Sequence, residues 1–310
     1  MAATVRVGTC SWADEALSKR FYPRGTKPGD RLAYYATHFS TVEVDSTYYR
    51  LPDEELVAKW AERTPDGFVM HVKAFGLMTR HPVRAEVLPP DIREAVEVDE
   101  RGRVDRPPRE VRAEVFRRFL AALEPLRAQG KLGGILMQFP SYIVPKESSF
   151  AYLEWAREQL GGDEMLVEFR HRDWLDEDRR VETLRFLEEL GATHVVTDSP
   201  ATGGKNVMPL VPALTSETAY VRLHGRNAAT WNKRGGSAAE RFDYLYAEEE
   251  LRELAGPVGE LAREAESAYV FFNNNSQSPG PPGGPEWVSQ AATNAQQLKG
   301  VLADVGIPVG

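Results

Sequence analysis

Short apolar segments rich in β-branched and aromatic residues recur eight times along the chain, and segments with helical periodicity separate most of them. The apolar segments cover residues 5–11, 41–49, 68–75, 133–139, 165–171, 194–198, 220–224 and 269–273. Their dense apolar runs lack clean alternation, as in parallel strands that are buried on both faces. Repeated strand-helix alternation predicts a parallel sheet, and eight such units favour an α/β fold closed into a (β/α)8 TIM barrel.

Helical patterns occupy most of the gaps between these strands. They cover residues 28–38, 53–63, 110–129, 148–160, 178–190, 248–266 and 286–305. Asp53 stands where an N-cap is expected, and Gly130 follows the third helix as a C-terminal glycine would. Residues 200–216, between the sixth and seventh strands, are rich in Gly and Pro and predict a loop or a very short helix.

A long insertion at residues 82–108 follows the third strand, on the side of the barrel where active sites form. Residues 97–98 and Val104 in its flanks could pair as a small hairpin. Two further long loops, at residues 227–239 and 275–285, are typical of lids, binding loops or disordered segments. Because one TIM barrel needs ~250 residues, we expect residues 1–310 to form a single domain.

Composition narrows the partners and the location. The net charge is −8 at pH 7, unlike the basic face of a protein that follows a nucleic-acid backbone, so extended nucleic-acid binding is not expected. Cys10 is the single cysteine and cannot form an internal disulfide. The N-terminus lacks a signal-peptide pattern, and no run approaches the ~20 apolar residues of a membrane-spanning helix. We therefore expect a cytoplasmic protein with no membrane partner.

Polar side chains gather at the C-terminal ends of the predicted strands, where barrels of this type carry their catalytic groups. The catalytic candidates are Glu43, Lys73, Glu168, Asp198 and His224. The candidates for substrate binding are Trp12, Asp45, Tyr48, Arg170, His171, Trp174, Arg222, Arg226, Asn273 and Asn274, and Trp231 in a long loop could also stack on a base or sugar. Burying a charge is costly unless it is paired or solvated, so this many charged strand ends predict a polar pocket.

Spacing within the strands suggests an anion site. Side chains two residues apart share a face of a strand, so Arg222 and His224 point the same way and Arg226 follows at the same interval. TIM barrels often hold phosphate near the loops after strands seven and eight, and the arginine fork suits phosphate. We expect a small anionic, phosphate-bearing substrate here. The alternative is that Arg222 pairs with Glu168 or Asp198 and serves only the fold.

The cofactor stays undetermined. Candidate ligands for a divalent metal ion are Glu43, Glu168, Asp198 and His224. No short ligand motif such as H-E-x-x-H is present, and the lysine and arginines among these residues could neutralise the carboxylates instead. We therefore assign no metal ligand.

Several motifs resemble those of a known family and keep their order. They are residues 8–12 (GTCSW), 21–23 (FYP), 42–49 (VEVDSTYY), 138–140 (QFP), 167–171 (VEFRH) with Trp174, 221–225 (VRLHG), and 272–274 (FNN) followed by Asn294 and Ala295. This set, which spans almost the whole chain, resembles the YecE-like family, domain of unknown function seventy-two. The resemblance implies a TIM barrel but no reaction, because the family is uncharacterised.

Three functions fit these observations. The favoured one is phosphoester hydrolysis, with Glu43 or Glu168 as general acid or base and with Lys73, Arg222 and nearby donors stabilising the developing charge. The second is isomerisation or epimerisation of a sugar, in which a carboxylate moves a proton next to a carbonyl. The third is a non-catalytic protein that binds a small anion or nucleotide. Fold analogy does not choose among them.

Overall fold

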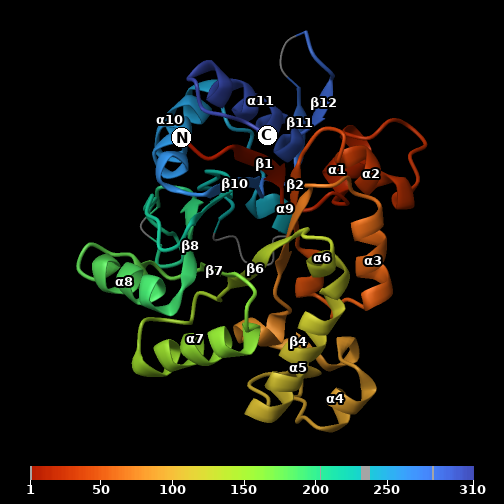
Figure 1. The fold of residues 1–310 in the computed structure, drawn as a ribbon, viewed down its shortest axis with the longest axis vertical. Coiled ribbons are helices and arrows are strands. Elements are labelled where there is room, and N and C mark those ends of the chain that lie inside the picture. The colour runs from red at the N-terminus through yellow and green to blue at the C-terminus, as the bar shows by residue number, and fades with distance from the viewer. Residues whose placement is uncertain (1, 203, 232–237, 281–282) are drawn as a thin grey trace.

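The computed structural model describes residues 2–202, 204–231, 238–280 and 283–310 (Figure 1). Its main sheet has eight parallel strands in the order β1-β10-β9-β8-β7-β6-β3-β2. An isolated bridge between Cys10 and Glu43 links β1 to β2, so the sheet is a nearly closed barrel and the predicted TIM barrel is confirmed. The strands are β1 (Val5–Thr9), β2 (Thr41–Val44), β3 (Val69–Lys73), β6 (Leu132–Gln138), β7 (Met165–Glu168), β8 (Ala192–Asp198), β9 (Thr218–Leu223) and β10 (Ser267–Phe272).

Helices follow most of the barrel strands. They are α1 (Glu15–Arg20), α2 (Arg31–Tyr35), α3 (Glu54–Glu62), α4 (Pro90–Glu94), α5 (Arg109–Ala122), α6 (Glu124–Ala128), α7 (Glu147–Leu160), α8 (Arg180–Leu190), α9 (Ala238–Arg241), α10 (Glu248–Glu264) and α11 (Gln290–Asp304). The single helix expected at residues 110–129 is two helices that meet at Leu123, because Pro125 has no backbone N–H for a continuous helix. The described residues between β8 and β9 contain no helix, as expected.

None of the helices in the described part of the chain combines the length and the apolar composition that a membrane span requires.

The insertion after β3 forms a two-stranded ribbon and α4, which lies beside α5 at one end of the molecule (Figure 1). β4 (Val83–Arg84) pairs with β5 (Arg103–Val104), so Val104 faces Val83 and the hairpin expected with residues 97–98 is wrong. Val83–Arg84 takes the pairing positions instead, and the backbone N–H of Ala85 donates to the Gly102 carbonyl oxygen at 2.9 Å.

The two long loops expected after β9 and β10 are described in part, since residues 232–237 and 281–282 lie outside the described residues. β11 (Gln277–Pro279) pairs with β12 (Trp287–Ser289) in the second loop. α11 therefore begins at Gln290, four residues later than the helix expected from residue 286.

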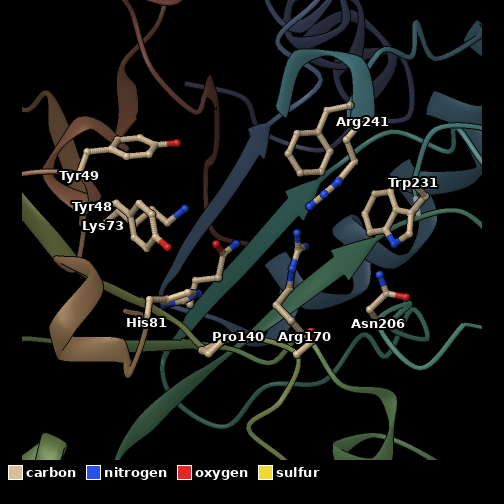
Figure 2. A pocket seen from close by; sticks show the side chains of 12 residues that line it. Tyr48, Tyr49, Lys73, His81, Pro140, Arg170, Asn206, Trp231 and Arg241 are labelled. Carbon is tan, nitrogen blue, oxygen red and sulfur yellow. The ribbon is translucent and has the colours of Figure 1, made fainter. Parts of the chain in front are cut away.

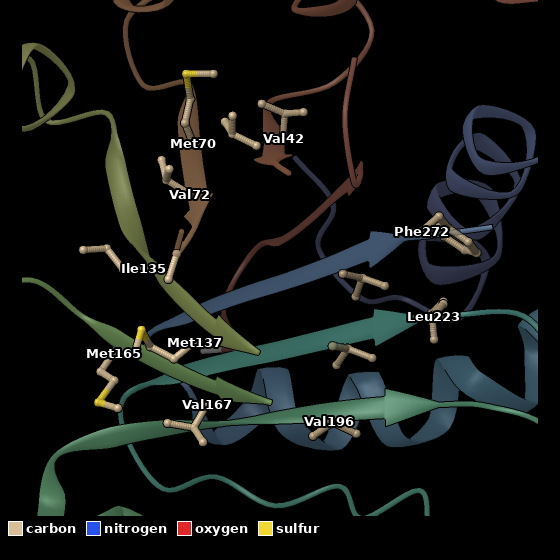
Figure 3. Packing of buried hydrophobic residues seen from close by; sticks show 14 of the residues in the cluster. Val42, Met70, Val72, Ile135, Met137, Met165, Val167, Val196, Leu223 and Phe272 are labelled. Carbon is tan, nitrogen blue, oxygen red and sulfur yellow. The ribbon is translucent and has the colours of Figure 1, made fainter. Parts of the chain in front are cut away.

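Side chains alternate strictly along the barrel strands. One set packs among the helices in a continuous apolar core, part of which Figure 3 shows: Val42, Met70, Val72, Ile135, Met137, Met165, Val167, Val196, Leu223 and Phe272. The other set fills the barrel interior, where a separate apolar cluster includes Leu136, Leu166, Tyr220 and Phe271. Residues two positions further along these strands, such as Arg222 and Glu168, therefore also face the interior.

A histidine completes this interior cluster. The ring of His71 lies 4.4 Å from Tyr269 and 4.9 Å from Tyr220, and neither ring nitrogen has a hydrogen-bond partner among the described residues. Burial lowers the pKa of His71 to about 3, so it is a neutral packing residue. β6 passes it at Gly133, where a Cβ atom would lie 2.5 Å from the imidazole Nε2. The interior is thus filled beneath the strand ends.

Candidate functional site

A pocket of about 320 Å³ opens at the C-terminal ends of the strands (Figure 2). Lys73 ends β3, Gln138 ends β6, and Arg170 follows β7. The lining residues are Tyr48, Tyr49, Lys73, His81, Gln138, Pro140, Ser141, Arg170, Asn206, Trp231, Arg241 and Phe242. Lysine or arginine supplies three of these side chains, and none of the described lining residues is acidic. The charged side chains of the described lining are therefore all positive.

Arg222 is buried in the barrel beside this pocket, and two carboxylates bind its guanidinium. Its Nε donates to Glu43 Oε2 at 2.8 Å, its Nη2 donates to Glu43 Oε1 at 2.7 Å, and its Nη1 donates to Glu168. Tyr220 also donates its hydroxyl proton to Glu43 at 3.0 Å. This arrangement contradicts the expected role of Arg222 as a substrate ligand, because a buried guanidinium needs its counter-charges. The alternative pairing with Glu168 is the one present.

Glu168 is the most heavily bonded carboxylate of the region. Besides Arg222, it accepts from Gln138 at 2.9 Å, from Arg170 at 3.0 Å and from His224 at 3.2 Å. Burial is the largest single influence and would raise its pKa, but Arg222, His224 and Arg170 together outweigh burial and hold the pKa of Glu168 well below its usual range. Glu168 is therefore a permanent anion and a poor general acid or base near neutral pH.

His224 completes what we call the buried charge network, which comprises Glu43, Glu168, Arg222 and His224. Asn273 donates its amide to His224 Nδ1 at 3.0 Å, so the proton is on Nε2 and faces Glu168. Burial lowers the pKa of His224 to about 3 despite the neighbouring carboxylate, so the imidazole is neutral. Asn273 and His224 thus orient Glu168 and do not reach the lining.

Lys73 is half-buried and lines the pocket. Its Nζ lies 4.6 Å from the centre of the Tyr48 ring. Across the described residues, no carboxylate lies within 4.0 Å of this nitrogen and no acceptor is hydrogen-bonded to it. Burial and the charge of Arg222 lower the pKa of Lys73, although Glu43 and Asp45 oppose the shift.

Arg170 and Arg241 supply the other positive charges of the lining. Arg170 makes one bond to Glu168, and its guanidinium lies 5.6 Å from the Trp231 ring. Arg241 ends α9 and is exposed. Figure 2 shows the two guanidinium groups pointing toward each other from opposite walls. Burial is the larger cause of the lowered pKa of Arg170, and the charge of Arg241 contributes to it.

His81 lines the pocket as a neutral group. Its Nδ1 lies 2.8 Å from Thr79 Oγ1, and burial, reinforced by Lys73 and Arg170, lowers its pKa to about 3. A neutral imidazole in the lining can donate to or accept from a ligand without adding charge.

Asp45 follows β2 and is coupled to Lys73 without lining the pocket. Burial raises the pKa of Asp45 to about 6, and the opposing effect of the Lys73 charge is smaller. A carboxyl group that titrates there can exchange protons near neutral pH, unlike Glu168.

Asp198 and Arg226 form a separate cluster. Asp198 lies on the same side of β8 as Val196, which packs among the helices, so it faces away from the barrel interior. Arg226 donates to it at 2.9 Å, and Tyr246 donates its hydroxyl proton at 2.7 Å. Arg226 also contacts Glu250 at 3.2 Å. The expected placement of Asp198 and Arg226 in the main pocket is therefore wrong, and both line a second pocket of about 400 Å³.

Four other candidates for substrate binding lie outside the lining of the main pocket and contact other parts of the fold. Trp12 packs edge-on against Trp60 at 5.6 Å, and Trp174 stacks on Phe169 at 4.1 Å. The His171 ring accepts from the backbone N–H of Asp173 at the start of a 3-10 turn. Asn274 donates to Asn294 in α11 at 2.9 Å.

The four candidate metal ligands do not form one set. Glu43 and Glu168 bind arginine, His224 binds Glu168 and Asn273, and Asp198 faces the other way. In the described ranges, no group of three or more His, Cys, Asp or Glu residues could hold a metal ion.

Sequence reasoning missed part of the lining. Gln138 could have been found, because it ends β6 two residues after the interior Leu136. His81, Ser141, Asn206 and Arg241 come from loops or from a short helix and carry no periodic signal. Among the residues predicted from the sequence, Tyr48, Lys73, Arg170 and Trp231 line the pocket.

Comparison with known proteins places the whole chain in context. The family model described as "Protein of unknown function DUF72" matches residues 6–304. The UPF0759 protein YunF of Bacillus subtilis is 30% identical over 275 residues, which are 88% of this chain and 89% of that protein.

Two solved structures are also similar. A DUF72 family protein from Thermotoga maritima is 34% identical, with a TM-score of 0.74 and coverage of 97% of this chain and 99% of its own. A DUF72 family protein from Enterococcus faecalis is 27% identical, with a TM-score of 0.76 and coverage of 97% and 96%.

Proposed function

Since the chain belongs to the family described as "Protein of unknown function DUF72", whose description states no reaction, we propose a function from the pocket. The protein is an enzyme that binds a small substrate through a phosphate or carboxylate group. One observation carries this proposal: Lys73, Arg170 and Arg241 line one pocket, whose described lining has no acidic residue.

The pocket has the features of a small-anion site. Its volume of about 320 Å³ fits a small metabolite. Arg170 uses only one N–H group on Glu168, which leaves donors for a bidentate contact with an anion. Trp231 and Tyr48 supply flat apolar walls beside the charges.

Proton transfer next to a carbonyl is the reaction that the side chains support best. Phosphoester hydrolysis, which the strand ends favoured, needs Glu43 or Glu168 as a base, and both bind Arg222. Asp45, whose pKa is raised to about 6 by burial, can exchange protons near neutral pH, but it does not line the pocket and acts on it through the charge of Lys73. The absence of acidic groups from the described lining and the net charge of −8 fit a small anion better than a nucleic acid. We propose a cytoplasmic location, as expected from the sequence.

Thermal melting with inorganic phosphate at fixed ionic strength tests the anion site. Saturating phosphate should raise the Tm of the wild type by ~3–8 °C. Arg241→Ala should lose most of this shift. Arg185→Ala removes an exposed arginine on α8 that pairs with Glu189, and it should keep the shift. If phosphate and simple phosphate esters leave the wild-type Tm unchanged, or if Arg241→Ala shifts like the wild type, the pocket is not an anion site.

A further inference from the structure

Lys131, which is buried, and Lys73, which is half-buried, have different surroundings. Lys131 donates to the carbonyl oxygens of Ala61 and Thr64 at 2.6 and 2.8 Å. The Lys73 nitrogen makes no such bond to any described residue and contacts only the face of Tyr48. Lys131 is thus held by the fold, whereas the Lys73 amine is available to a molecule in the pocket.

We propose that Lys73 is a nucleophilic amine that forms a Schiff base with the carbonyl group of an anionic aldehyde or ketone. The inference rests on the proposed function, because Arg170 and Arg241 hold the anionic group of that molecule. Figure 2 shows the Lys73 nitrogen on one side of the pocket and the two guanidinium groups on the other. A substrate that spans the pocket has its charge at one end and its carbonyl at the amine.

The charges around Lys73 keep its amine reactive. Glu43 and Asp45 on the β2 side and Glu168 on β7 would attract a protonated lysine, and Arg222 on β9 repels it. Because Glu43 and Glu168 bind Arg222, neither forms an ion pair with Lys73. Burial and Arg222 lower the lysine pKa, and only the unprotonated amine attacks a carbonyl.

The reaction balances without another reagent. The Lys73 nitrogen forms a bond to the carbonyl carbon, and the carbonyl oxygen becomes a hydroxyl group. That oxygen then leaves as water, with one proton from the amine and one from solvent. The product is a protonated imine that keeps the second amine proton. Its positive nitrogen draws electrons from the neighbouring C–H bond, which prepares the proton transfer proposed above.

Pyridoxal 5′-phosphate, an aldehyde with a phosphate group, is the probe. The folded protein is incubated with less than one equivalent, reduced with borohydride and digested, and each lysine is assessed by mass spectrometry. Lys73 should be labelled at least ~10-fold faster than exposed Lys19 and Lys59, a difference equal to one pKa unit. Inorganic phosphate should slow the labelling. Lys73→Arg, which keeps the charge, should abolish this fast label.

The outcomes separate the two proposals. Phosphate stabilisation with Lys73 labelled no faster than Lys19 overturns the Schiff base and leaves the anion site standing. Fast labelling of Lys73 by pyridoxal without phosphate, unaffected by inorganic phosphate, supports the amine and overturns the anion site. Should Lys73→Arg fail to fold, the wild-type map of labelled lysines still decides.

Discussion

The buried charge network and the pocket lining adjoin at the strand ends, yet their charges are balanced differently. In the network, the guanidinium of Arg222 lies within hydrogen-bond distance of both Glu43 and Glu168. In the lining, Arg170 has one carboxylate partner, and Lys73 has none among the residues described. One region is neutralised within the protein and the other is not.

This difference distinguishes charged residues that stabilise the fold from charged residues that can bind a ligand. A buried charge with its counter-charges in place has little left to offer a ligand, and breaking the set is costly. A positive group without a counter-charge gains from an anion that enters from solvent. Both regions lie at the strand ends, so position does not distinguish them. What distinguishes them is whether each positive side chain has a carboxylate partner within the protein.

The largest expected effect comes from breaking the network. Arg222→Met leaves two carboxylates without their buried counter-charge, so we expect the free energy of unfolding to fall by about 3–5 kcal/mol. Urea denaturation followed by circular dichroism measures it. Adding Glu43→Gln and Glu168→Gln should restore part of the loss, because the unpaired charges are then gone.

Arg226→Met is the matched control, since Arg226 lies three residues beyond β9 and also pairs with carboxylates, but its side chain is 25% exposed. It should lose about 1 kcal/mol. If the two variants lose equal stability, burial of the charge network adds nothing to its contribution to stability. That result would contradict the distinction between the network and the pocket lining.

An effect of intermediate size on stability is expected at Glu168, because this carboxylate contacts residues of both regions. Glu168→Gln removes a charge that binds both Arg222 and Arg170, so we expect a loss of about 1.5–3 kcal/mol in stability. Phosphate affinity should rise at the same time, because Arg170 is released and a negative charge disappears. Calorimetric titration with phosphate checks this, and a weaker affinity would place Glu168 among the groups that bind the ligand.

Much of the fold follows from the sequence because burial on both faces leaves a local signal. All eight barrel strands coincide with dense apolar runs, and the period of two gives the facing of Glu43, Glu168 and Arg222 correctly. The same period applied to β8 puts Asp198 with Val196 on the helix side. Asp198 was misplaced because the prediction used its position at the end of a strand and not the face of the strand on which its side chain lies.

The partners of these residues could not be predicted in the same way. Glu43, Glu168 and Arg222 come from β2, β7 and β9, and their pairing depends on where distant strands lie around the barrel. Arg241 lines the same pocket as Lys73 because the segment after β9 that contains α9 brings it there, and no periodic pattern in the sequence marks it. Local periodicity predicts which way a side chain points, but contact across a barrel is a property of the closed sheet.

A smaller effect concerns pH and Asp45. Burial raises the folded-state pKa of Asp45 to about 6, above its unfolded value of about 3.9, so the folded state binds more protons between these values. This carboxyl group therefore makes stability fall as pH rises through that window. Asp45→Asn should raise the unfolding free energy by about 1–2 kcal/mol at pH 7 and leave it unchanged below pH 4. An equal gain at both pH values would assign the effect to packing.

The smallest expected change in stability is at Lys73, and a small change is the result that supports a role in ligand binding. Lys73→Met removes a buried amine that no described acceptor holds, so stability at pH 7 should change by less than about 0.5 kcal/mol or rise. Lys131→Met removes two bonds to carbonyl oxygens and should cost about 1.5–3 kcal/mol. Because the pKa of Lys73 is lowered in the folded state, its penalty is present at neutral pH and fades as pH rises toward the unfolded value of about 10.4. Denaturation of both variants at pH 7 and pH 9.5 separates a lysine kept for the fold from one kept for a ligand; a large loss in Lys73→Met would place Lys73 with the supporting network.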